Sequence, residues 1–175
     1  APASTTNMNR EMKAAEKTFA HVDESGQPSM VDVSGKDSTV RTAVARGTIQ
    51  LPDDALEHLK ENELHSKKGP VFQTAILAGI QGAKETSRLI PLCRPLPLED
   101  CCLTISMEKP PEAVIECVCR TTGKTGVEME ALTGVSIAAL TLYDMCKSFS
   151  HEMVLKDIHL VHKAGGKQTV GAPIS

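Results

Sequence analysis

Two hydrophobic periods divide the chain into predicted strands and helices. Apolar and polar residues that alternate one by one indicate a strand with one buried face, whereas apolar residues that recur every three or four positions indicate a helix. Strand patterns are found in four segments, residues 39–51, 98–107, 113–120 and 153–163. Helical patterns are found in two long segments, residues 70–90 and 127–148. The chain is therefore expected to mix both kinds of element.

A short helix and a turn complete the predicted order of elements. Pro52 followed by ALEHLK predicts a short helix after the first strand, because proline is favoured at a first helical position. Residues 108–112 are turn-forming by composition and join the second and third strands in a hairpin. The order strand, helix, strand, strand, helix, strand predicts an α+β, ferredoxin-like split βαβ fold. Its antiparallel sheet should carry helices on one face, plus a short helical insertion.

The predicted domain organisation is simple. Residues 1–20 are polar and lack a sustained apolar face, so a flexible N-terminal lead is expected there. Residues 21–167 are expected to form a single domain, since 175 residues of which 41% are hydrophobic are enough to bury one core. Residues 168–175 are expected to be a flexible C-terminal tail.

Composition narrows the classes of partner. The formal net charge is −3, and the chain has three Phe, one Tyr and no Trp. It therefore offers neither the basic field nor the aromatic stacking surfaces of a nucleic-acid binder. No apolar run approaches the roughly 20 residues needed to cross a bilayer, and the N-terminus lacks the apolar stretch of a signal peptide. A soluble, intracellular protein without nucleic-acid or membrane partners is expected.

Six cysteines invite a search for a metal site. Cys101 and Cys102 are adjacent, Cys117 and Cys119 alternate along a predicted strand, and no pair has C-x-x-C spacing. Reduced thiols that pack as small hydrophobic side chains are therefore the favoured interpretation, and no metal site is expected.

Asp144 and Lys147 are polar residues at the end of an otherwise apolar helix. Three residues apart, they share one helix face, and the common interpretation of such a pair is a local ion pair on a solvated surface. If the helix end is covered, a buried acid and amine would have shifted pKa values, as proton-transfer groups usually do. The residues alone leave both interpretations open.

Glu128 and Glu130 begin the same predicted helix, where carboxylates are also favoured by the helix dipole alone. Glu130 and Asp144 are fourteen residues apart, which corresponds to about 21 Å along a helix axis. One small substrate could not touch both residues of a single chain. If both serve one pocket, a second subunit related by a two-fold axis must contribute one of them.

The run TGKTGVEMEALTGVSIAALTLYDMCK resembles the signature of the cyclic pyranopterin monophosphate synthases, also called molybdenum cofactor biosynthesis protein C. Three further blocks agree in order and spacing: MVDVSGK near residue 30, KGPVFQTAILAGIQGAKETSRLIPLCRPLPL from Lys68, and AGGK ending at Lys167. The resemblance covers residues 21–167. It implies a ferredoxin-like fold and a homohexamer, built as a trimer of dimers with active sites at the dimer interface.

The implied reaction converts 3′,8-cyclo-7,8-dihydroguanosine 5′-triphosphate, a small molecule, to cyclic pyranopterin monophosphate with release of pyrophosphate. Acid and base groups must open and reclose rings, and cations must hold the departing pyrophosphate. Neither a metal nor a redox cofactor is required, although Mg²⁺ could accompany the phosphates. The implied compartment is the cytoplasm in a bacterium and the mitochondrial matrix in a eukaryote.

The resemblance also implies roles for matched residues. Proton transfer is carried over to three residues, Lys68, Asp144 and Lys147, whose clustered amines should lower one another's pKa. Binding of the triphosphate is carried over to three basic residues, Arg41, Lys163 and Lys167. Contact with the rest of the substrate is carried over to Leu92, Cys93, Arg94, Glu128, Met129 and Glu130.

Three positions depart from the family pattern. Leu92-Cys93-Arg94-Pro95 stands where the family has L-C-H-P, so a residue able to exchange protons has become a permanent cation. Lys68-Gly69-Pro70 replaces K-G-D and removes a capping Asp, which is expected to cost stability. Gln168-Thr169 replaces the usual S-G and could alter the C-terminal phosphate loop.

These departures keep a rival interpretation open. Arg94 would suit a catalytically impaired homologue that binds the triphosphate, or serves in assembly, without turnover. A third interpretation, a ferredoxin-like nucleic-acid module, predicts RNA affinity that falls with salt, but the acidic balance and missing aromatic residues argue against it.

Overall fold

The computed structural model describes residues 18–172, which form two compact units, residues 18–31 and 32–172. In the first unit, the Asp23 carboxylate accepts hydrogen bonds from the backbone N–H groups of Ser25 and Gln27, both at 2.9 Å. These bonds stabilise a turn that is closed by a bridge between Val22 and Pro28. The second unit contains all the elements described below.

The predicted ends of the chain fall partly outside the described residues. Residues 1–17 of the expected lead and residues 173–175 of the expected tail lie outside them. Within the described part of the tail, Val170 forms a two-way backbone pair with Lys163, with both N–H···O distances at 3.0 Å. The boundaries of the predicted domain stay predictions.

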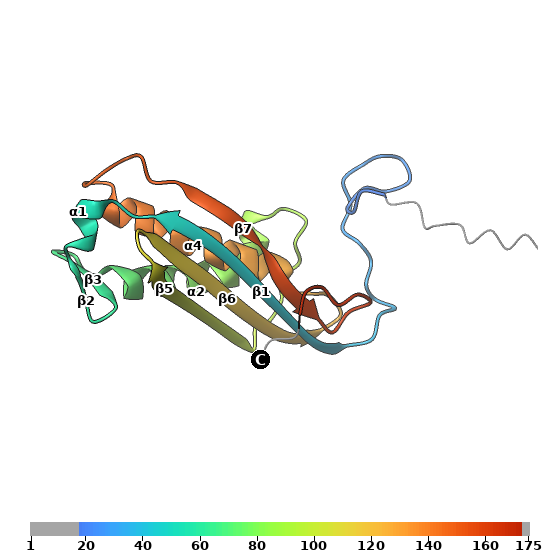
Figure 1. Ribbon diagram of the computed structural model, residues 1–175. Coiled ribbons are helices and arrows are strands. Elements are labelled where there is room, and N and C mark those ends of the chain that lie inside the picture. The colour runs from blue at the N-terminus through green and yellow to red at the C-terminus, as the bar shows by residue number, and fades with distance from the viewer. Residues whose placement is uncertain (1–17, 173–175) are drawn as a thin grey trace, which may run out of the picture. The chain divides into compact units, whose positions relative to one another are not determined.

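A four-stranded antiparallel sheet forms the framework of the second unit (Figure 1). Its strands are β1 (Thr39–Gln50), β5 (Asp100–Lys109), β6 (Glu112–Gly123) and β7 (Leu155–Ala164). They lie in the order β5-β6-β1-β7, so the first strand sits between the last two. This order confirms the predicted ferredoxin-like α+β fold, and β5 and β6 form the expected hairpin.

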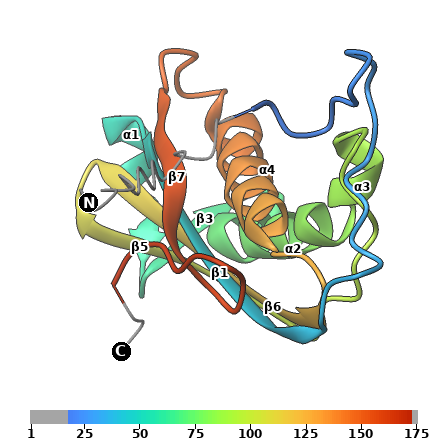
Figure 2. The same cartoon turned by 90° about the vertical axis from the view of Figure 1, so that its right-hand side faces the viewer.

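Helices α2 (Val71–Lys84) and α4 (Glu128–Cys146) pack on one face of this sheet, as Figure 2 shows. The short helix α3 (Thr86–Leu89) follows α2 and contacts both of these helices. The predicted helix over residues 70–90 is divided in two because the backbone leaves helical geometry at Glu85, with ψ near 4°. None of the helices in residues 18–172 is long and apolar enough to span a membrane.

Glycines let α2 and α4 approach closely. A Cβ atom on Gly79 of α2 would lie 2.8 Å from the backbone oxygen of Gly134 on α4. A Cβ on Gly134 would lie 2.8 Å from the sulfur of Cys117 on the sheet. Larger residues at either position would push the two helices apart, so these glycines fix how α4 lies on the sheet.

The insertion after β1 is mostly a small sheet, which the sequence pattern did not predict. The expected helix is confirmed as one turn, α1 (Asp53–Leu56), and is followed by β2 (Leu59–Lys60), β3 (Glu63–Ser66) and β4 (Gly69–Pro70). Glu61 and Asn62 both have positive φ, 52° and 62°, which is the backbone of a tight two-residue hairpin turn. Two- and four-residue strands are too short for a hydrophobic period to reveal.

Candidate active site

Helix α4 carries predicted site residues at both of its ends. Its apolar side is buried against α2 and the sheet, and Val127, Val135 and Leu142 are completely inaccessible to solvent. The helix begins with Glu128 and ends at Cys146, so Asp144 lies in its last turn. Because the whole buried side is held in place, the helix fixes the positions of both terminal groups.

A hairpin tip brings Lys68 to the C-terminal end of α4. Ser66 pairs with Gly69 across β3 and β4, which leaves Lys67 and Lys68 as the two turn residues. The Ser66 hydroxyl donates to the Gly69 carbonyl at 2.9 Å and accepts from the Lys68 N–H at 3.1 Å. Gly69 has a φ of 110°, a conformation that favours glycine. The tip is therefore well defined.

The hairpin tip and the end of α4 border an open pocket of about 710 Å³. All three predicted proton-transfer residues, Lys68, Asp144 and Lys147, are in its wall. The other wall residues are Ala55, His58, Leu64, His65, Ser66, Lys67, Val71, Met145, Cys146, Ser148 and Phe149. A volume of this size accommodates a nucleotide-sized ligand.

Asp144 and Lys147 form an ion pair at the rim of this pocket. The Nζ of Lys147 donates to Oδ1 of Asp144 at 2.7 Å, and the two side chains are 53% and 67% exposed. This hydrogen bond, then the charge of Lys147 and the more distant charge of Lys68, lowers the pKa of Asp144. The same hydrogen bond and the charge of Asp144 raise the pKa of Lys147.

The expected lowering of amine pKa values is therefore wrong for Lys147 in this chain. The Asp144 carboxylate, which accepts the hydrogen bond and carries a negative charge, stabilises the ammonium form of Lys147. Near neutral pH the pair rests as carboxylate and ammonium, so Lys147 is set to donate a proton or stabilise an anion.

The opposite end of α4 holds a second group of predicted residues. The Nζ of Lys163 on β7 lies 3.5 Å from Oε1 of Glu128. The other oxygen of Glu128, Oε2, is buried and has no hydrogen-bond partner among residues 18–172. The Oγ1 atom of Thr125, three residues earlier, is likewise buried and without a hydrogen-bond partner among the described residues. Buried polar atoms without partners are costly, so this end of the helix is suited to receive a polar ligand.

Glu130 and Cys93 are electrostatically linked at this end. Glu130 is only 4% exposed, and burial, with a smaller contribution from the charge of Glu128, raises its pKa to about 7. Burial raises the pKa of the Cys93 thiol, and the carboxylates of Glu130 and Glu128 raise it further while Arg94 lowers it. Cys93 is thus a neutral thiol, and Glu130 can either accept or donate a hydrogen bond near neutral pH.

Basic residues lie around the same end of the sheet. Arg41 donates from Nε to the Gly123 carbonyl at 3.2 Å, and its Nη1 would lie 2.7 Å from a Cβ on Gly166. Lys167 follows in the same loop and is exposed. Arg94 is half-buried, and its charge helps to lower the pKa of Asp32. Leu92 is half-buried and Met129 is 37% exposed.

The chain thus separates its predicted site residues into two groups. One group, Lys68, Asp144 and Lys147, is brought together in the pocket at the C-terminal end of α4. The other group lies at the N-terminal end, about fourteen residues or roughly 21 Å away along the helix. A single chain does not bring the two groups together.

Several pocket residues were not expected from the sequence. His58 and His65 are both in the pocket wall. The ring of His58 packs against that of Phe149, with centroids 5.6 Å apart. Glu63, on β3 of the same hairpin, accepts hydrogen bonds from the backbone N–H groups of Phe72 and Gln73, at 2.7 and 3.0 Å. In the sequence, only the closeness of these residues to Lys68 along the chain could have pointed to them.

The carboxylate of Glu63 also explains how α2 begins without the family's capping Asp. Pro70 provides no side-chain cap, but Glu63 occupies the free N–H groups of the first helical turn from a neighbouring strand. The expected loss of a cap at Pro70 is thereby offset.

A ferredoxin-like domain with an acid and two amines in one pocket has the arrangement of an acid–base enzyme. Comparison with known proteins makes this specific. The MoaC family model matches residues 30–166, and the chain belongs to the MoaC family.

Individual relatives agree with the family assignment. The cyclic pyranopterin monophosphate synthase of Xanthomonas oryzae pv. oryzae is 45% identical over 160 residues, which cover 91% of this chain and 97% of the relative. The protein of the same name from Clostridium acetobutylicum is 47% identical, covering 86% and 93%. Molybdenum cofactor biosynthesis protein 1 of Dictyostelium discoideum is 42% identical over 86% of this chain, but only 27% of that longer protein is covered.

Proposed function

We propose that this chain is a cyclic pyranopterin monophosphate synthase of molybdenum cofactor biosynthesis. It converts 3′,8-cyclo-7,8-dihydroguanosine 5′-triphosphate to cyclic pyranopterin monophosphate and releases pyrophosphate. Membership of the MoaC family and similarity to synthases over nearly their whole length support this function. The structural observation that carries it is the convergence of Lys68, Asp144 and Lys147 on one pocket.

The charge state of this trio suits the chemistry of ring opening and closure. The ammonium of Lys147 is stabilised by Asp144 and so provides a proton for a departing nitrogen or oxygen. The Asp144 carboxylate holds that ammonium in place and accepts a proton in a later step. Lys68, on the hairpin tip, places a second amine on the opposite wall, where it stabilises negative charge that develops in the substrate.

The second group is proposed to bind the two ends of the substrate. Arg41, Lys163 and Lys167 suit the triphosphate, because their charges match phosphate oxygens. Glu130 and Glu128 suit the amino-pyrimidine edge, which presents N–H donors to carboxylate oxygens. The orphaned Oε2 of Glu128 then gains a partner on binding. Leu92, Cys93, Arg94 and Met129 complete the surface that contacts the substrate.

A complete site requires two copies of the chain in this proposal. One copy supplies the proton-transfer trio and a two-fold related copy supplies the binding group, since the two groups lie at opposite ends of α4. The proposed assembly is a hexamer built from three such dimers.

The proposed reaction needs proton transfer and charge neutralisation, which side chains provide, and Mg²⁺ would enter only with the phosphates. The six cysteines are all free thiols, which suits a reducing compartment. That compartment is the cytoplasm if the host is bacterial and the mitochondrial matrix if it is eukaryotic.

The direct test is to incubate this protein with the purified cyclised triphosphate and to measure the release of pyrophosphate. Turnover with formation of the cyclic monophosphate is expected, and tight binding of the triphosphate without release of pyrophosphate would favour the impaired homologue instead. None of the relatives or structural features favours that alternative.

Arg94 is the residue on which the impaired alternative depends, so it has its own test. We expect Arg94→His to preserve or raise kcat, because histidine restores a residue that exchanges protons near neutral pH. Steady-state rates of pyrophosphate release measure this. A large loss of kcat in Arg94→His would mean that the arginine has a task of its own in this chain.

A further inference from the structure

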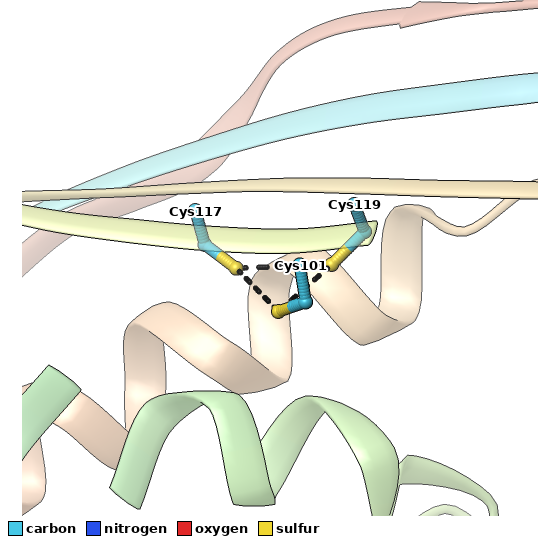
Figure 3. A group of neighbouring side chains, drawn as sticks. All are labelled: Cys101, Cys117 and Cys119. Carbon is cyan, nitrogen blue, oxygen red and sulfur yellow. Dashed lines mark hydrogen bonds between the residues drawn. The ribbon is translucent and has the colours of Figure 1, made fainter. Parts of the chain in front are cut away.

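Three cysteine thiols converge between the sheet and the helices. Cys101 lies on β5, and Cys117 and Cys119 lie on β6. Cys101 is directly opposite Cys119 in the strand pairing, and Leu103 is opposite Cys117. Residues two apart on a strand share a face, so all three sulfurs lie on the same side of the sheet. Figure 3 shows them pointing toward one another and toward the helices.

The sulfur triangle has nearly equal sides. The Sγ–Sγ distances are 4.0 Å from Cys101 to Cys117, 3.8 Å from Cys117 to Cys119 and 3.8 Å from Cys119 to Cys101. The centre of this triangle is about 2.2 Å from each sulfur, close to the metal–thiolate bond length of about 2.3 Å. An ion in the plane of the sulfurs would therefore fit with little movement of the strands.

From this geometry we infer that Cys101, Cys117 and Cys119 form a three-coordinate thiolate site for a soft monovalent ion, Cu(I). Soft thiolate ligands select Cu(I), whereas structural Zn²⁺ is almost always bound by four ligands. Among residues 18–172, the group of ligand atoms within 4.8 Å of one another contains only these three thiols. The site thus offers three soft ligands, which satisfy Cu(I) without a fourth.

The surroundings favour a closed site with one entrance. Cys117 and Cys119 are completely buried, and the backbone of Gly134 on α4 lies close to the Cys117 sulfur. Cys101 is only half-buried and lies on the edge strand of the sheet, so an ion can enter from its side. The charge of Lys84, which acts on Cys101, offsets part of the negative charge of the thiolates.

Binding replaces thiol protons by the ion. Each cysteine that binds as a thiolate releases its proton to solvent, and copper stays monovalent because no electron is transferred.

The test is an anaerobic titration of the full chain with Cu(I) against bicinchoninate, a competing chelator. One Cu(I) per chain is expected, and copper X-ray absorption should show three sulfur neighbours without nitrogen or oxygen. Cys101→Ser should weaken binding by more than about a hundredfold, since even outer-shell changes cost about 10- to 100-fold. Cys117→Ala, which leaves the interior apolar, should do the same.

Cys102→Ser is the matched control. It makes the same exchange one position along β5, but Cys102 is exposed on the opposite face. Its Cu(I) affinity, and the rise in Tm on adding Cu(I), should equal those of the wild type. The proposed site would be overturned if Cys102→Ser lost as much Cu(I) affinity as Cys101→Ser, or if Cys101→Ser kept the wild-type affinity. Nitrogen or oxygen neighbours at copper would also overturn it. So would preferential binding of Zn²⁺.

Discussion

Individual side chains in this molecule owe their properties to one or two close neighbours. Asp144 and Lys147 are both well exposed, yet each has a shifted pKa because of the 2.7 Å hydrogen bond between them. The pKa of Glu130 shifts chiefly because burial removes water from its carboxyl group. At the C-terminal end of α4 a hydrogen bond stabilises two opposite charges, whereas at the N-terminal end burial makes a carboxyl group easy to neutralise.

The first prediction at this scale concerns the two amines. Lys68→Ala and Lys147→Ala should each lower kcat for pyrophosphate release by about a hundredfold or more, the usual effect of losing an acid or base. Lys60→Ala provides the control, because Lys60 is an exposed lysine of the same small sheet and is not in the pocket wall. Near-normal rates in both pocket variants would refute the proposed roles.

The second prediction concerns pH and Glu130. Its ordinary pKa of 4.5 rises to about 7 in the folded chain, so between these values the folded state binds more protons than the unfolded state. Stability should therefore fall as pH rises through this window, by about 3 kcal/mol for this group. In Glu130→Gln this part of the pH dependence should vanish, which urea unfolding at about pH 5 and about pH 8 would measure. If the free energy of unfolding changed with pH equally in wild type and Glu130→Gln, the titrating carboxyl would not be buried as described.

Elements in this fold are held in place by groups from distant parts of the chain. Glu63 on β3 caps the first turn of α2, and the same strand leads into the hairpin tip that carries Lys68. The start of a core helix and the position of a pocket residue therefore depend on one carboxylate.

The third prediction tests this cap. Glu63→Ala should lower the free energy of unfolding by about 1–2 kcal/mol, because two backbone N–H groups of α2 lose their acceptor. Glu57→Ala, an exposed glutamate at the end of α1, should change it by no more than about 0.5 kcal/mol. Chemical denaturation followed by circular dichroism measures both. An unaffected Glu63→Ala would show that Pro70 alone suffices to start the helix.

How far sequence predicts structure depends here on the length of the element. The long elements were predicted well, since ten or more residues of β1 or α4 give a clear period. Strands β2 and β4 have two residues each, which is too few to show a period, and the turn at Glu61 and Asn62 marks only the connection from β2 to β3. The predicted helix over residues 70–90 missed its break at Glu85, because a change in ψ at one residue leaves the hydrophobic pattern intact.

The candidate site was predictable in part for the same reason. Asp144 and Lys147 share a helix face, so three-residue spacing was enough to pair them. The approach of Lys68 depends on a hairpin whose strands the pattern could not reveal. The thiol triangle depends on the register of β5 against β6, which places Cys101 opposite Cys119. Contacts between strands leave no fixed spacing in the sequence, so the search for C-x-x-C motifs did not find them.

On the scale of the whole molecule, the two groups of site residues make an assembled dimer the proposed functional unit. Each chain would contribute the trio to one pocket and the binding group to another. A mixture of two inactive variants should then recover activity, because some pockets receive only intact halves.

The fourth prediction uses this logic. When Lys147→Ala and Glu130→Gln chains are refolded together, about a quarter of all pockets should be intact, and pyrophosphate release should return to about a quarter of the wild-type rate. Lys147→Ala mixed with Lys68→Ala is the control, since both changes affect the same group and every pocket stays defective. If the first mixture is as inactive as the control, the pocket is not shared between chains.

The unbroken length of α4 has a consequence for how this domain can change. Each residue turns a helix by about 100°, so deleting a single residue near Gly134 would rotate Asp144 away from the hairpin and leave Glu130 where it is. The length of this helix therefore sets the spacing between the two groups of site residues. Among variants of this domain that keep the activity, we expect insertions and deletions to be absent between Glu128 and Lys147.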